Sequence, residues 1–540
     1  MGGIFKPRPV IFTDDGWIMG MPGPITVNAL KDKIIGNYAG MNSALWWSIG
    51  DHEVYHYETQ LGETFGDDSD GSNDPSNPQI ESKSMTHGEQ QAQNLRSLID
   101  ECGGPLTALT SFSRKVGLQF FGRIRMNSHY EHAPLDSRYG RFRREHPELL
   151  IGLPSISIGD DEWTEGSVEW GIRTGLNFKF LEVRKLMTDI VCEIFERFDV
   201  DGVEMDFFRH PAFFKAEEAY QHRYTITDMV RHVRQRMNKV NTYHNKAIKL
   251  AVRVPATVAD SVRIGLDVIH WIKEGLVDIV VVGGGHIPFD TPIREFVEAA
   301  EGTECHIYGC ITASRYLDTM NIRALAQRFW SHGASGIYLY NFFTISREWH
   351  EKIYKDISDP ATLAQLDKRY EVDKILPFYP IQGHGAAFRY ASPPGQLPVT
   401  LTDTNSKSGP IINIEVNDDL TSETAQAKLR RCCLVLRFES FPKRNKLDVR
   451  INGEALPWAS ATISFDGWTR QHVESWNRYP TNPVPAHYEG ASVEFALTYP
   501  PLMEGINKVE IRQIDSDLSA NERIVLIGTE ISIEYKKHSL

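Results

Sequence analysis

The chain lacks an excess of basic residues, a cysteine framework and a long apolar run. Its 58 Lys and Arg residues are outnumbered by 71 Asp and Glu residues, which gives a net charge of −13. This balance argues against a nucleic-acid partner, because such partners usually need a basic face. No segment approaches the ~20 consecutive apolar residues of a membrane span, so we expect no membrane partner.

The six cysteines show no CxxC pair or regular spacing, which excludes a zinc ribbon and a disulfide scaffold. The N-terminal residues lack the apolar core of a signal peptide, and Lys6 stands where a myristoylation signal needs Ser or Thr. The localisation stays open: cytoplasmic, or periplasmic or secreted if a signal peptide has been removed.

A chain of 540 residues exceeds what one hydrophobic core usually serves, so we expect two domains. The first two-thirds alternates short apolar runs with amphipathic helices, a rhythm typical of parallel βα units. The runs are 9–13, 42–48, 117–126, 202–206, 248–254, 277–283, 305–311 and 336–342. Eight runs predict an α/β fold, a (β/α)₈ TIM barrel over residues 1–357, with a doubly wound sheet as the competing arrangement.

Helical spacing predicts helices over 181–198, 265–273 and 321–332, and another starting near Thr227 as its N-cap. Gly275 and Gly333 stand where helices end. Two long insertions, 67–84 and 127–167, follow the second and third strands. At a barrel mouth such loops either line the cleft for a large substrate or merely cover the barrel.

After Pro360 the pattern changes to alternation with period two. Residues 358–383 form a predicted linker, and 384–540 a predicted antiparallel β-sandwich in the style of a jelly roll. The predicted strands are 411–416, 433–438, 446–451, 492–497, 508–513 and 530–535. Asn452-Gly453 is a turn signal.

The strongest chemical signal is the segment from Asp201 to His210, which contains two carboxylates on one face of a strand. Because Val203 and Met205 suit the helix layer, Glu204 and Asp206 should point into the barrel near its top. Burying two acids is expensive unless they are paired or functional, and strand C-termini are where barrel enzymes place catalysis. Arg209 and His210 follow directly and either pair with the acids or bind substrate.

The first and third strands end in further polar residues. Asp14, Asp15 and Trp17 follow the first strand. One of these acids either binds a sugar hydroxyl, ionises beside Glu204 and Asp206 of the fourth strand, or simply makes an Asx turn or helix cap. After the third strand come candidates for substrate binding and acid–base chemistry: Arg125, Asn127, His129 and Glu131. Arg123 alternates with Arg125 on the same face.

Weaker candidates lie at the same rim. They are Arg253, His286, Tyr340 and Asn341, at the ends of strands five, six and eight, and Trp47, whose ring could stack on a sugar or be core. The triple glycine at 283–285 lacks a Walker lysine, so it indicates a tight turn.

Three stretches, 10–16, 122–129 and 201–209, resemble the family-10-like glycosyl-hydrolase-like barrels of polysaccharide-degrading bacteria. The resemblance covers most of residues 8–357 and implies a glycan substrate and carboxylate chemistry. Two departures limit it. The seventh strand, 306–313, has no carboxylate where retaining barrel hydrolases place a nucleophile, and Phe208 stands where chitinase-like barrels place their acid.

These patterns favour a glycoside hydrolase. One of Glu204 and Asp206 would protonate the glycosidic oxygen, and Asp14, Asp15 or Glu131 would supply the second carboxylate. The alternatives are a uronate lyase working through His129, Tyr130 or His210, and an inactive glycan-binding barrel. We expect a carbohydrate partner, no cofactor and no metal, and leave homo-oligomerisation open.

Overall fold

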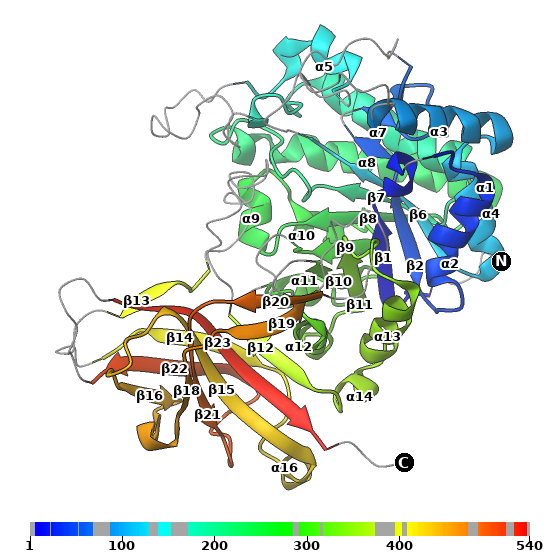
Figure 1. The fold of residues 1–540 in the computed structure, drawn as a ribbon. Coiled ribbons are helices and arrows are strands. Elements are labelled where there is room, and N and C mark those ends of the chain that lie inside the picture. Colours follow the sequence, from blue (N-terminus) through cyan, green and yellow to red (C-terminus); the bar gives the residue numbers. More distant parts are fainter. Residues whose placement is uncertain are drawn as a thin grey trace, which may run out of the picture.

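The computed structural model describes residues 6–21, 23–51, 53–67, 87–128, 139–152, 171–284, 291–313, 317–372, 395–401, 408–472, 484–514 and 523–536. Its ribbon shows a barrel with surrounding helices and, beside the barrel, a group of antiparallel sheets (Figure 1). Within the described ranges, no helix is both long and apolar enough to span a bilayer.

Eight parallel strands close the barrel in the order β1-β11-β10-β9-β8-β7-β6-β2. Their bounds are β1 Val10–Asp14, β2 Ala44–Ser48, β6 Gln119–Arg125, β7 Gly202–Asp206, β8 Lys249–Val254, β9 Ile279–Val282, β10 His306–Thr312 and β11 Gly336–Tyr340. Each strand falls within two residues of its predicted run. The predicted (β/α)₈ barrel is therefore confirmed, because an open doubly wound sheet has two edges and this sheet has none.

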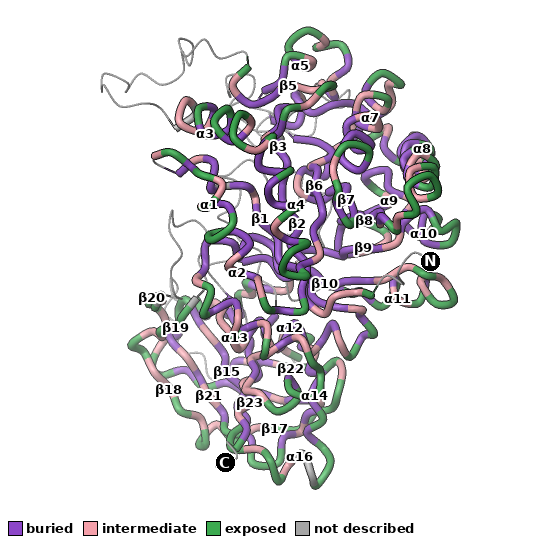
Figure 2. Tube along the Cα trace, turned by 90° about the vertical axis from the view of Figure 1, so that its right-hand side faces the viewer, coloured by how far each residue is buried: buried purple, intermediate pink, exposed green. Residues whose placement is uncertain are grey.

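The two faces of the strands differ as the alternation of side chains requires. Val203 and Met205 of β7 belong to the large core between the strands and the helices. Glu204, on the other face, reaches Tyr338 of the small cluster inside the barrel. The predicted inward direction of the acids is thus confirmed. Figure 2 shows the barrel strands almost wholly buried, with exposed residues on the surrounding helices and loops.

The barrel helices are α7 Leu181–Arg197, α8 Ala219–His244, α9 Val258–Arg263, α10 Val268–Lys273, α11 Arg294–Ala300, α12 Thr319–Ser331 and α13 Arg347–Ile357. The N-cap prediction at Thr227 is wrong. That residue lies inside α8, and its hydroxyl accepts a hydrogen bond from Trp271 Nε1 at 2.8 Å. The helix predicted over 265–273 is α10, which begins at Val268; α9 ends before that range, and Gly265 between the two helices is left-handed (φ 92°).

Around β1, β2 and β6 the chain adds elements that the periodicity did not indicate. Short helical segments follow β1: η1 Trp17–Gly20, α1 Val27–Leu30, η2 Lys31–Ile35 and α2 Gly36–Tyr38. A small sheet then follows β2, made of β3 Gly50–Asp51, β4 Val54–Tyr55 and β5 Glu63–Thr64. Helices α3 His87–Cys102 and α4 Pro105–Val116 precede β6, and α5 Arg141–Glu145 and η3 Pro147–Leu149 follow it. Most of both predicted long loops lies outside the described residues.

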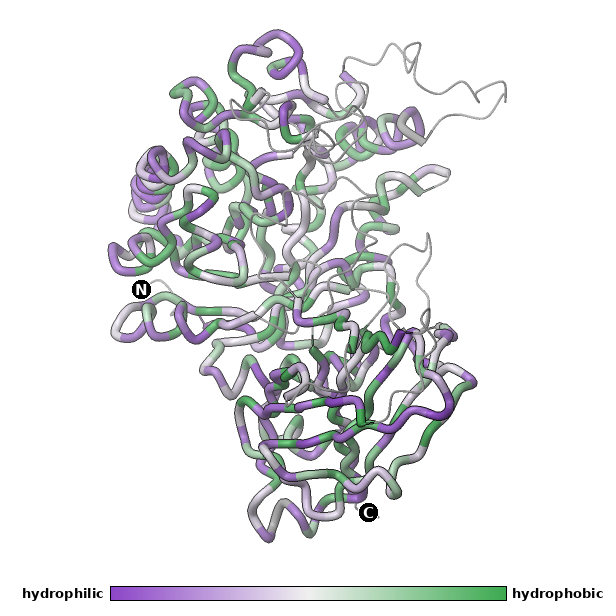
Figure 3. Tube along the Cα trace, turned by 90° about the vertical axis from the view of Figure 1, so that its left-hand side faces the viewer, coloured by the Kyte–Doolittle hydropathy of each residue, from purple (hydrophilic) through white to green (hydrophobic). Residues whose placement is uncertain are grey.

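The second domain consists of two antiparallel sheets with a shared core. One sheet contains β12 Lys368–Glu371, β13 Val399–Leu401, β15 Leu429–Ser440, β18 Thr462–Ser464, β21 Ala491–Ala496 and β23 Ile524–Tyr535. The other contains β14 Ile411–Val416, β16 Leu447–Ile451, β17 Glu454–Leu456 and β22 Gly505–Gln513. Figure 3 shows hydrophilic and hydrophobic residues alternating along these strands, because only one face of each sheet packs against the other.

Smaller elements complete this domain. A separate hairpin pairs β19 Trp468–His472 with β20 Val484–Tyr488, α14 Pro360–Leu363 precedes β12, and α16 Glu423–Lys428 and η5 Trp458–Ser460 lie in the connections. The predicted turn at Asn452-Gly453 joins β16 to β17, and both residues have positive φ (52° and 89°), as a type I′ hairpin requires. Strand β12 lies inside the range 358–383 that the sequence indicates as a linker.

Helix α12 joins the two domains. On one side it packs on β10 and β11, and on the other Ala324 belongs to the core of the second domain. Asn321 of this helix donates hydrogen bonds to the backbone of Arg369 (3.0 Å) and to the carboxylate of Glu371 (3.2 Å). The helix therefore packs on the barrel on one side and makes apolar and polar contacts with the second domain on the other.

The last turn of α12 makes an ionic contact with β14. His332 Nε2 lies 2.6 Å from Glu415 Oε1, and Arg328 Nε lies 3.5 Å from Oε2. Although burial by itself would raise the pKa of Glu415, the hydrogen bond with His332 and the charge of Arg328 lower it to about 2. The ionised carboxylate is thus stabilised in the folded protein relative to the unfolded chain.

We expect Glu415→Gln to lower the thermal unfolding midpoint near neutral pH, with a loss of roughly 1–3 kcal/mol for the charge-assisted contacts. The loss should be complete above pH 4.5, the ordinary pKa of the carboxyl, and shrink as the pH falls toward about 2. Thermal unfolding of both proteins across this range measures it. Glu454→Gln, an exposed position of the same sheet, is the control, and an equal loss in both variants would contradict the assignment.

Candidate functional site

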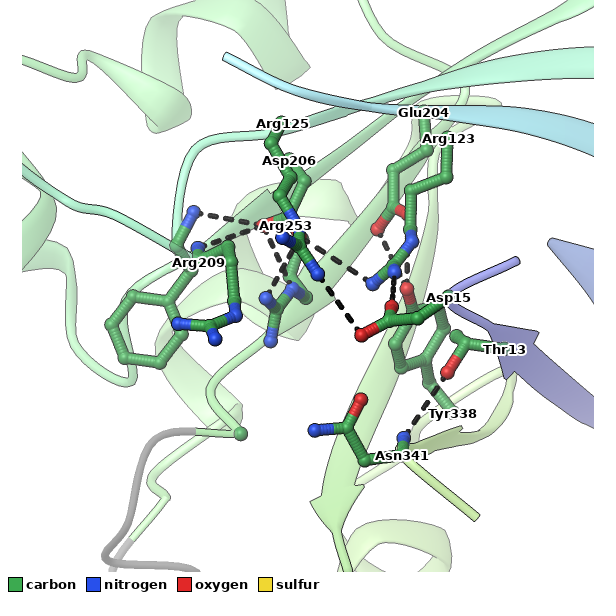
Figure 4. A network of polar contacts seen from close by, with 12 residues as sticks. Thr13, Asp15, Arg123, Arg125, Glu204, Asp206, Arg209, Arg253, Tyr338 and Asn341 are labelled. Atoms are coloured by element: carbon green, nitrogen blue, oxygen red, sulfur yellow. Dashed lines mark hydrogen bonds and ion pairs between the residues drawn. The ribbon is translucent and has the colours of Figure 1, made fainter. Parts of the chain in front are cut away.

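Charged and polar side chains from five strands meet inside the barrel at the carboxyl ends of the strands. They come from β1, β6, β7, β8 and β11, as Figure 4 shows. The strand register explains the arrangement, because it places Arg125 and Arg253 on either side of Asp206, and Arg123 beside Glu204 one step lower. Alternating side chains thus form an upper row of charge across β6, β7 and β8 and a lower row across β6 and β7.

Asp206 is the acid of the upper row, and its carboxylate is saturated with donors. Arg253 contacts it with two nitrogens, Nε at 2.9 Å and Nη2 at 2.8 Å, and the backbone N–H groups of Phe208 and Arg209 donate to Oδ1 at 3.0 Å each. Burial opposes ionisation, but the charges of Arg253 and Arg123 outweigh it and lower the pKa of Asp206. Asp206 is therefore a buried carboxyl group whose ionised form is stabilised by its partners.

Glu204 lies one step deeper, in a less cationic environment. Its carboxyl oxygens accept the hydroxyl of Tyr338 at 2.9 and 3.0 Å, and Arg123 Nε stands 4.0 Å away. Burial and the neighbouring charge of Asp206 raise the pKa of Glu204 to about 8. At neutral pH Glu204 is therefore mainly protonated. Glu204 and Asp206 are 0% and 1% exposed, so solvent reaches neither acid in this structure.

Arg123 lies at the centre of the cluster and is fully buried. Its guanidinium forms an ion pair with Asp15 and lies 3.7 Å from Asp206 and 4.0 Å from Glu204. The ring of Tyr340 lies 5.0 Å from the guanidinium carbon, within cation–π range. One guanidinium thus contacts three carboxyl groups, and it counters the desolvation penalty of each.

Asp15 and Asp14 have opposite surroundings although they are neighbours. Asp15 faces the barrel, where Arg123 and Arg125 (2.9 Å) contact its two oxygens; its side chain is 20% exposed. Although burial would raise the pKa of Asp15, these arginines lower it. The Asp14 carboxylate accepts the Gly16 N–H at 2.7 Å, which is the Asx turn considered from the sequence, and burial raises its pKa to about 7. Burial and the charge of Asp14 raise the pKa of Tyr38, which lies in the helix layer.

Strand β11 contributes Tyr338, Tyr340 and Asn341 to the wall beside β1. The ring of Tyr340 lies 4.1 Å from the guanidinium carbon of Arg253, and the Asn341 N–H donates to Thr13 Oγ1 at 3.2 Å. The predicted candidates Arg125, Arg253, Tyr340 and Asn341 therefore lie in one cluster with Asp15 and Asp206. Among the residues the structure describes, no group of three or more His, Cys, Asp or Glu side chains could hold a metal ion.

Other predicted residues lie elsewhere. Asn127 is buried, and its amide is occupied by the protein: Nδ2 donates to the backbone of Leu176 and Ala212, and Oδ1 accepts the N–H of Ser128. Asn127 therefore holds together the backbone segments at Ser128, Leu176 and Ala212. Trp47 is fully buried in the core between strands and helices, so its ring packs as a core residue. The segment after β9 turns tightly, as predicted, with positive φ at Gly283 and Gly284.

Arg209 and His210 follow β7 as predicted; Arg209 is half-buried and His210 is buried. Three further candidates, His129, Glu131 and His286, lie outside the described residues, as does the side chain of Trp17, whose backbone begins η1. For these side chains the predicted roles stay predictions.

Three residues of the cluster had no predicted role: Arg123, Tyr338 and Thr13. Each stands two residues before a candidate that was named, on the same face of its strand: Arg125, Tyr340 and Asp15. Because side chains alternate along a strand, the period of two could have identified all three.

No protein-family model matches the chain, and no curated protein sequence matches it. The solved structures to which it is similar include a GH36 α-galactosidase from Geobacillus stearothermophilus (10% identity, TM-score 0.36) and a maltogenic α-amylase from Thermotoga neapolitana (12%, 0.33). A third is the chitinase ChiW from Paenibacillus sp. (10%, 0.38).

The similarity to these glycoside hydrolases covers 94, 92 and 96% of this chain, and 55, 98 and 56% of the three structures in that order. The chain thus spans little more than half of the α-galactosidase and of the chitinase. With TM-scores below 0.5, these likenesses carry no argument about activity. The resemblance to family-10-like proteins stays a prediction.

We expect Glu204→Gln to become more stable relative to the parent protein as the pH rises. The folded parent keeps a proton on Glu204 up to a pKa of about 8, whereas the unfolded chain releases it near the ordinary value of 4.5. The parent therefore loses stability between these values, and glutamine, which mimics the protonated acid, does not. Urea unfolding midpoints near both ends of this window measure the effect.

Asp278→Asn is the control of opposite sign for this prediction. Although burial opposes it, Arg234 and the N–H of Leu250 lower the pKa of Asp278, so its ionised form stabilises the fold. Its loss should destabilise the protein at both ends of the window. A Glu204→Gln variant that is equally destabilised at both would contradict the raised pKa of Glu204.

Proposed function

We propose that the protein is a glycoside hydrolase that cleaves a polysaccharide or oligosaccharide with carboxyl groups at the mouth of its barrel. One observation supports this above the others. A carboxyl with a raised pKa, Glu204, and a carboxylate kept ionised and partly exposed, Asp15, contact the same guanidinium. Pairs of acids whose surroundings push their pKa values apart are typical of acid–base catalysis.

The two acids fit the two tasks of glycosidic cleavage. Glu204, protonated at neutral pH, is the candidate proton donor to the leaving oxygen, and Asp15, ionised, is the candidate nucleophile or base. Both contact Arg123, which is compatible with the separations of about 5 to 9.5 Å that retaining and inverting enzymes use. Asp206, saturated with donors, would keep Arg253 and Arg123 in place.

Asp15 is the acid that a ligand would meet first, because its side chain is 20% exposed, whereas Glu204 lies deeper behind Arg123. The two acids must therefore be tested separately. For the uronate lyase, two of the proposed bases, His129 and Tyr130, lie outside the described residues, and the third, His210, is as buried as Glu204. The reaction products therefore have to separate the lyase from the hydrolase.

We expect Asp15→Asn and Glu204→Gln each to lower kcat/KM by about 10²- to 10⁴-fold, the range that one acid or base contributes. The measurement is a panel of neutral, uronate, amino-sugar and sulfated polysaccharides, scored for new reducing ends and for ultraviolet-absorbing unsaturated products. Asp201→Asn is the matched control: this exposed acid lies at the opposite end of β7, so the variant should retain the parent rate.

The outcomes separate the hypotheses. New reducing ends without unsaturated products support hydrolysis, and unsaturated products would replace it with the lyase. Polysaccharide binding without either product would favour an inactive glycan-binding barrel. If Asp15→Asn and Glu204→Gln turn over substrate as fast as the parent, the assignment of both acids is wrong.

A further inference from the structure

Two polar atoms at the end of β11 are buried without a hydrogen-bond partner. They are the hydroxyl of Tyr340 and the side-chain oxygen of Asn341, whose residues are 3% and 7% exposed. Other groups of the cluster face partners: Asp206 accepts four hydrogen bonds, and the Tyr338 hydroxyl donates to Glu204. Arg123 Nε and Nη1 have no hydrogen-bond partner, but they lie 4.0 and 3.7 Å from carboxyl oxygens of Glu204 and Asp206. Buried polar atoms without partners are unfavourable and uncommon in native proteins, so these two indicate a place for a ligand.

The backbone of Asn341 is held in a conformation that few residues adopt. Its φ is 63°, in the left-handed region that asparagine tolerates better than most residues. The contact of its N–H with Thr13 Oγ1, which itself bonds to the Leu339 carbonyl at 3.2 Å, fixes this position against β1. In Figure 4 the amide points toward the side of the cluster where Asp15, Arg209 and Arg253 lie.

The ring of Tyr340 is also held in place. The guanidinium carbon of Arg253 lies 4.1 Å and that of Arg123 5.0 Å from its centroid, and the ring stacks on Tyr338 at 6.5 Å with an interplanar angle of 13°. The hydroxyl oxygen on a ring restrained in this way has a fixed position. Binding to it would need little reorganisation.

The chemistry of the two atoms limits what they bind. An amide oxygen accepts hydrogen bonds and cannot donate them, so Asn341 Oδ1 requires a donor. Carboxylate, sulfate and phosphate groups offer acceptors alone when ionised, whereas an alcohol O–H or an acetamido N–H donates. The Tyr340 hydroxyl serves as donor or acceptor. Together the two atoms suit a neutral sugar, whose hydroxyl groups both donate and accept.

We propose that Tyr340 and Asn341 form a subsite, the β11 subsite, that binds a neutral, hydrogen-donating part of the glycan and so determines which sugar residue enters beside Asp15. The inference rests on the proposed function, since it takes the ligand to be a glycan. It goes beyond that function because it states that the residues at the end of β11 bind the uncharged, hydrogen-donating groups of the glycan.

The test is ligand-observed saturation-transfer NMR on the full-length protein with the methyl glycosides of glucose, galactose, mannose and N-acetylglucosamine. We expect at least one of them to bind, and Tyr340→Phe and Asn341→Gly each to weaken its affinity at least tenfold. Glycine keeps the left-handed backbone available, and phenylalanine removes the hydroxyl alone. A preference for N-acetylglucosamine over glucose identifies the donor as an amide, and the reverse preference identifies it as a hydroxyl.

Thermal unfolding provides the second readout. Because the Tyr340 hydroxyl has no partner, Tyr340→Phe should keep or raise the unfolding temperature of the parent. Tyr338→Phe is the matched control: it removes a hydroxyl that bonds to Glu204 and should lower that temperature. A structural role for the Tyr340 hydroxyl would instead make Tyr340→Phe destabilising.

Three results would overturn the subsite: no glycoside binds the parent, the two variants bind as the parent does, or Tyr340→Phe weakens the binding of inorganic sulfate, an acceptor-only probe. These results are independent of turnover, so the hydrolase can stand while the subsite fails. Equally, glycoside binding that depends on both residues would support the subsite even if no polysaccharide is cleaved.

Discussion

A guanidinium with no exposure to solvent, that of Arg123, contacts carboxyl groups from β1 and β7. An isolated charge at this depth would be very unfavourable, so the cluster is stable only as a set. Removing one member of such a set leaves another charge uncompensated, which costs about 3–5 kcal/mol in buried pairs. The upper half of the barrel interior therefore depends on Arg123 and its partners being placed together.

The same set produces the electrostatic contrast on which the proposed chemistry depends. Asp206 has Arg253 on one side and two backbone N–H groups on another, whereas Glu204, one step deeper, has a tyrosine hydroxyl and a more distant guanidinium. Burial is nearly equal for both acids, so the number of nearby donors decides which one ionises. The contrast arises because inward-facing residues two positions apart along a strand have different neighbours: Asp206 lies between Arg125 and Arg253, whereas Glu204 lies beside Arg123.

The second domain is attached through the side of the barrel that carries α12. Apolar packing at Ala324 and charge-assisted contacts at Glu415 and Glu371 all reach this one helix. The candidate site draws its described residues from β1, β6, β7, β8 and β11, so the described part of the second domain supplies support for the barrel, and the proposed chemistry belongs to the barrel.

The sequence by itself determined the barrel strands, the inward direction of Glu204 and Asp206 and the alternating strands of the second domain, because period-two and helical patterns are local properties of the chain. It did not determine that Thr227 lies inside a helix or that the Asn127 amide hydrogen-bonds to the backbone of loops, since both follow from distant contacts. Likewise, only the tertiary structure set the pKa difference between Glu204 and Asp206 and left the Tyr340 hydroxyl unpaired. Those properties depend on which strands become neighbours when the barrel closes, and closure joins residues more than a hundred positions apart.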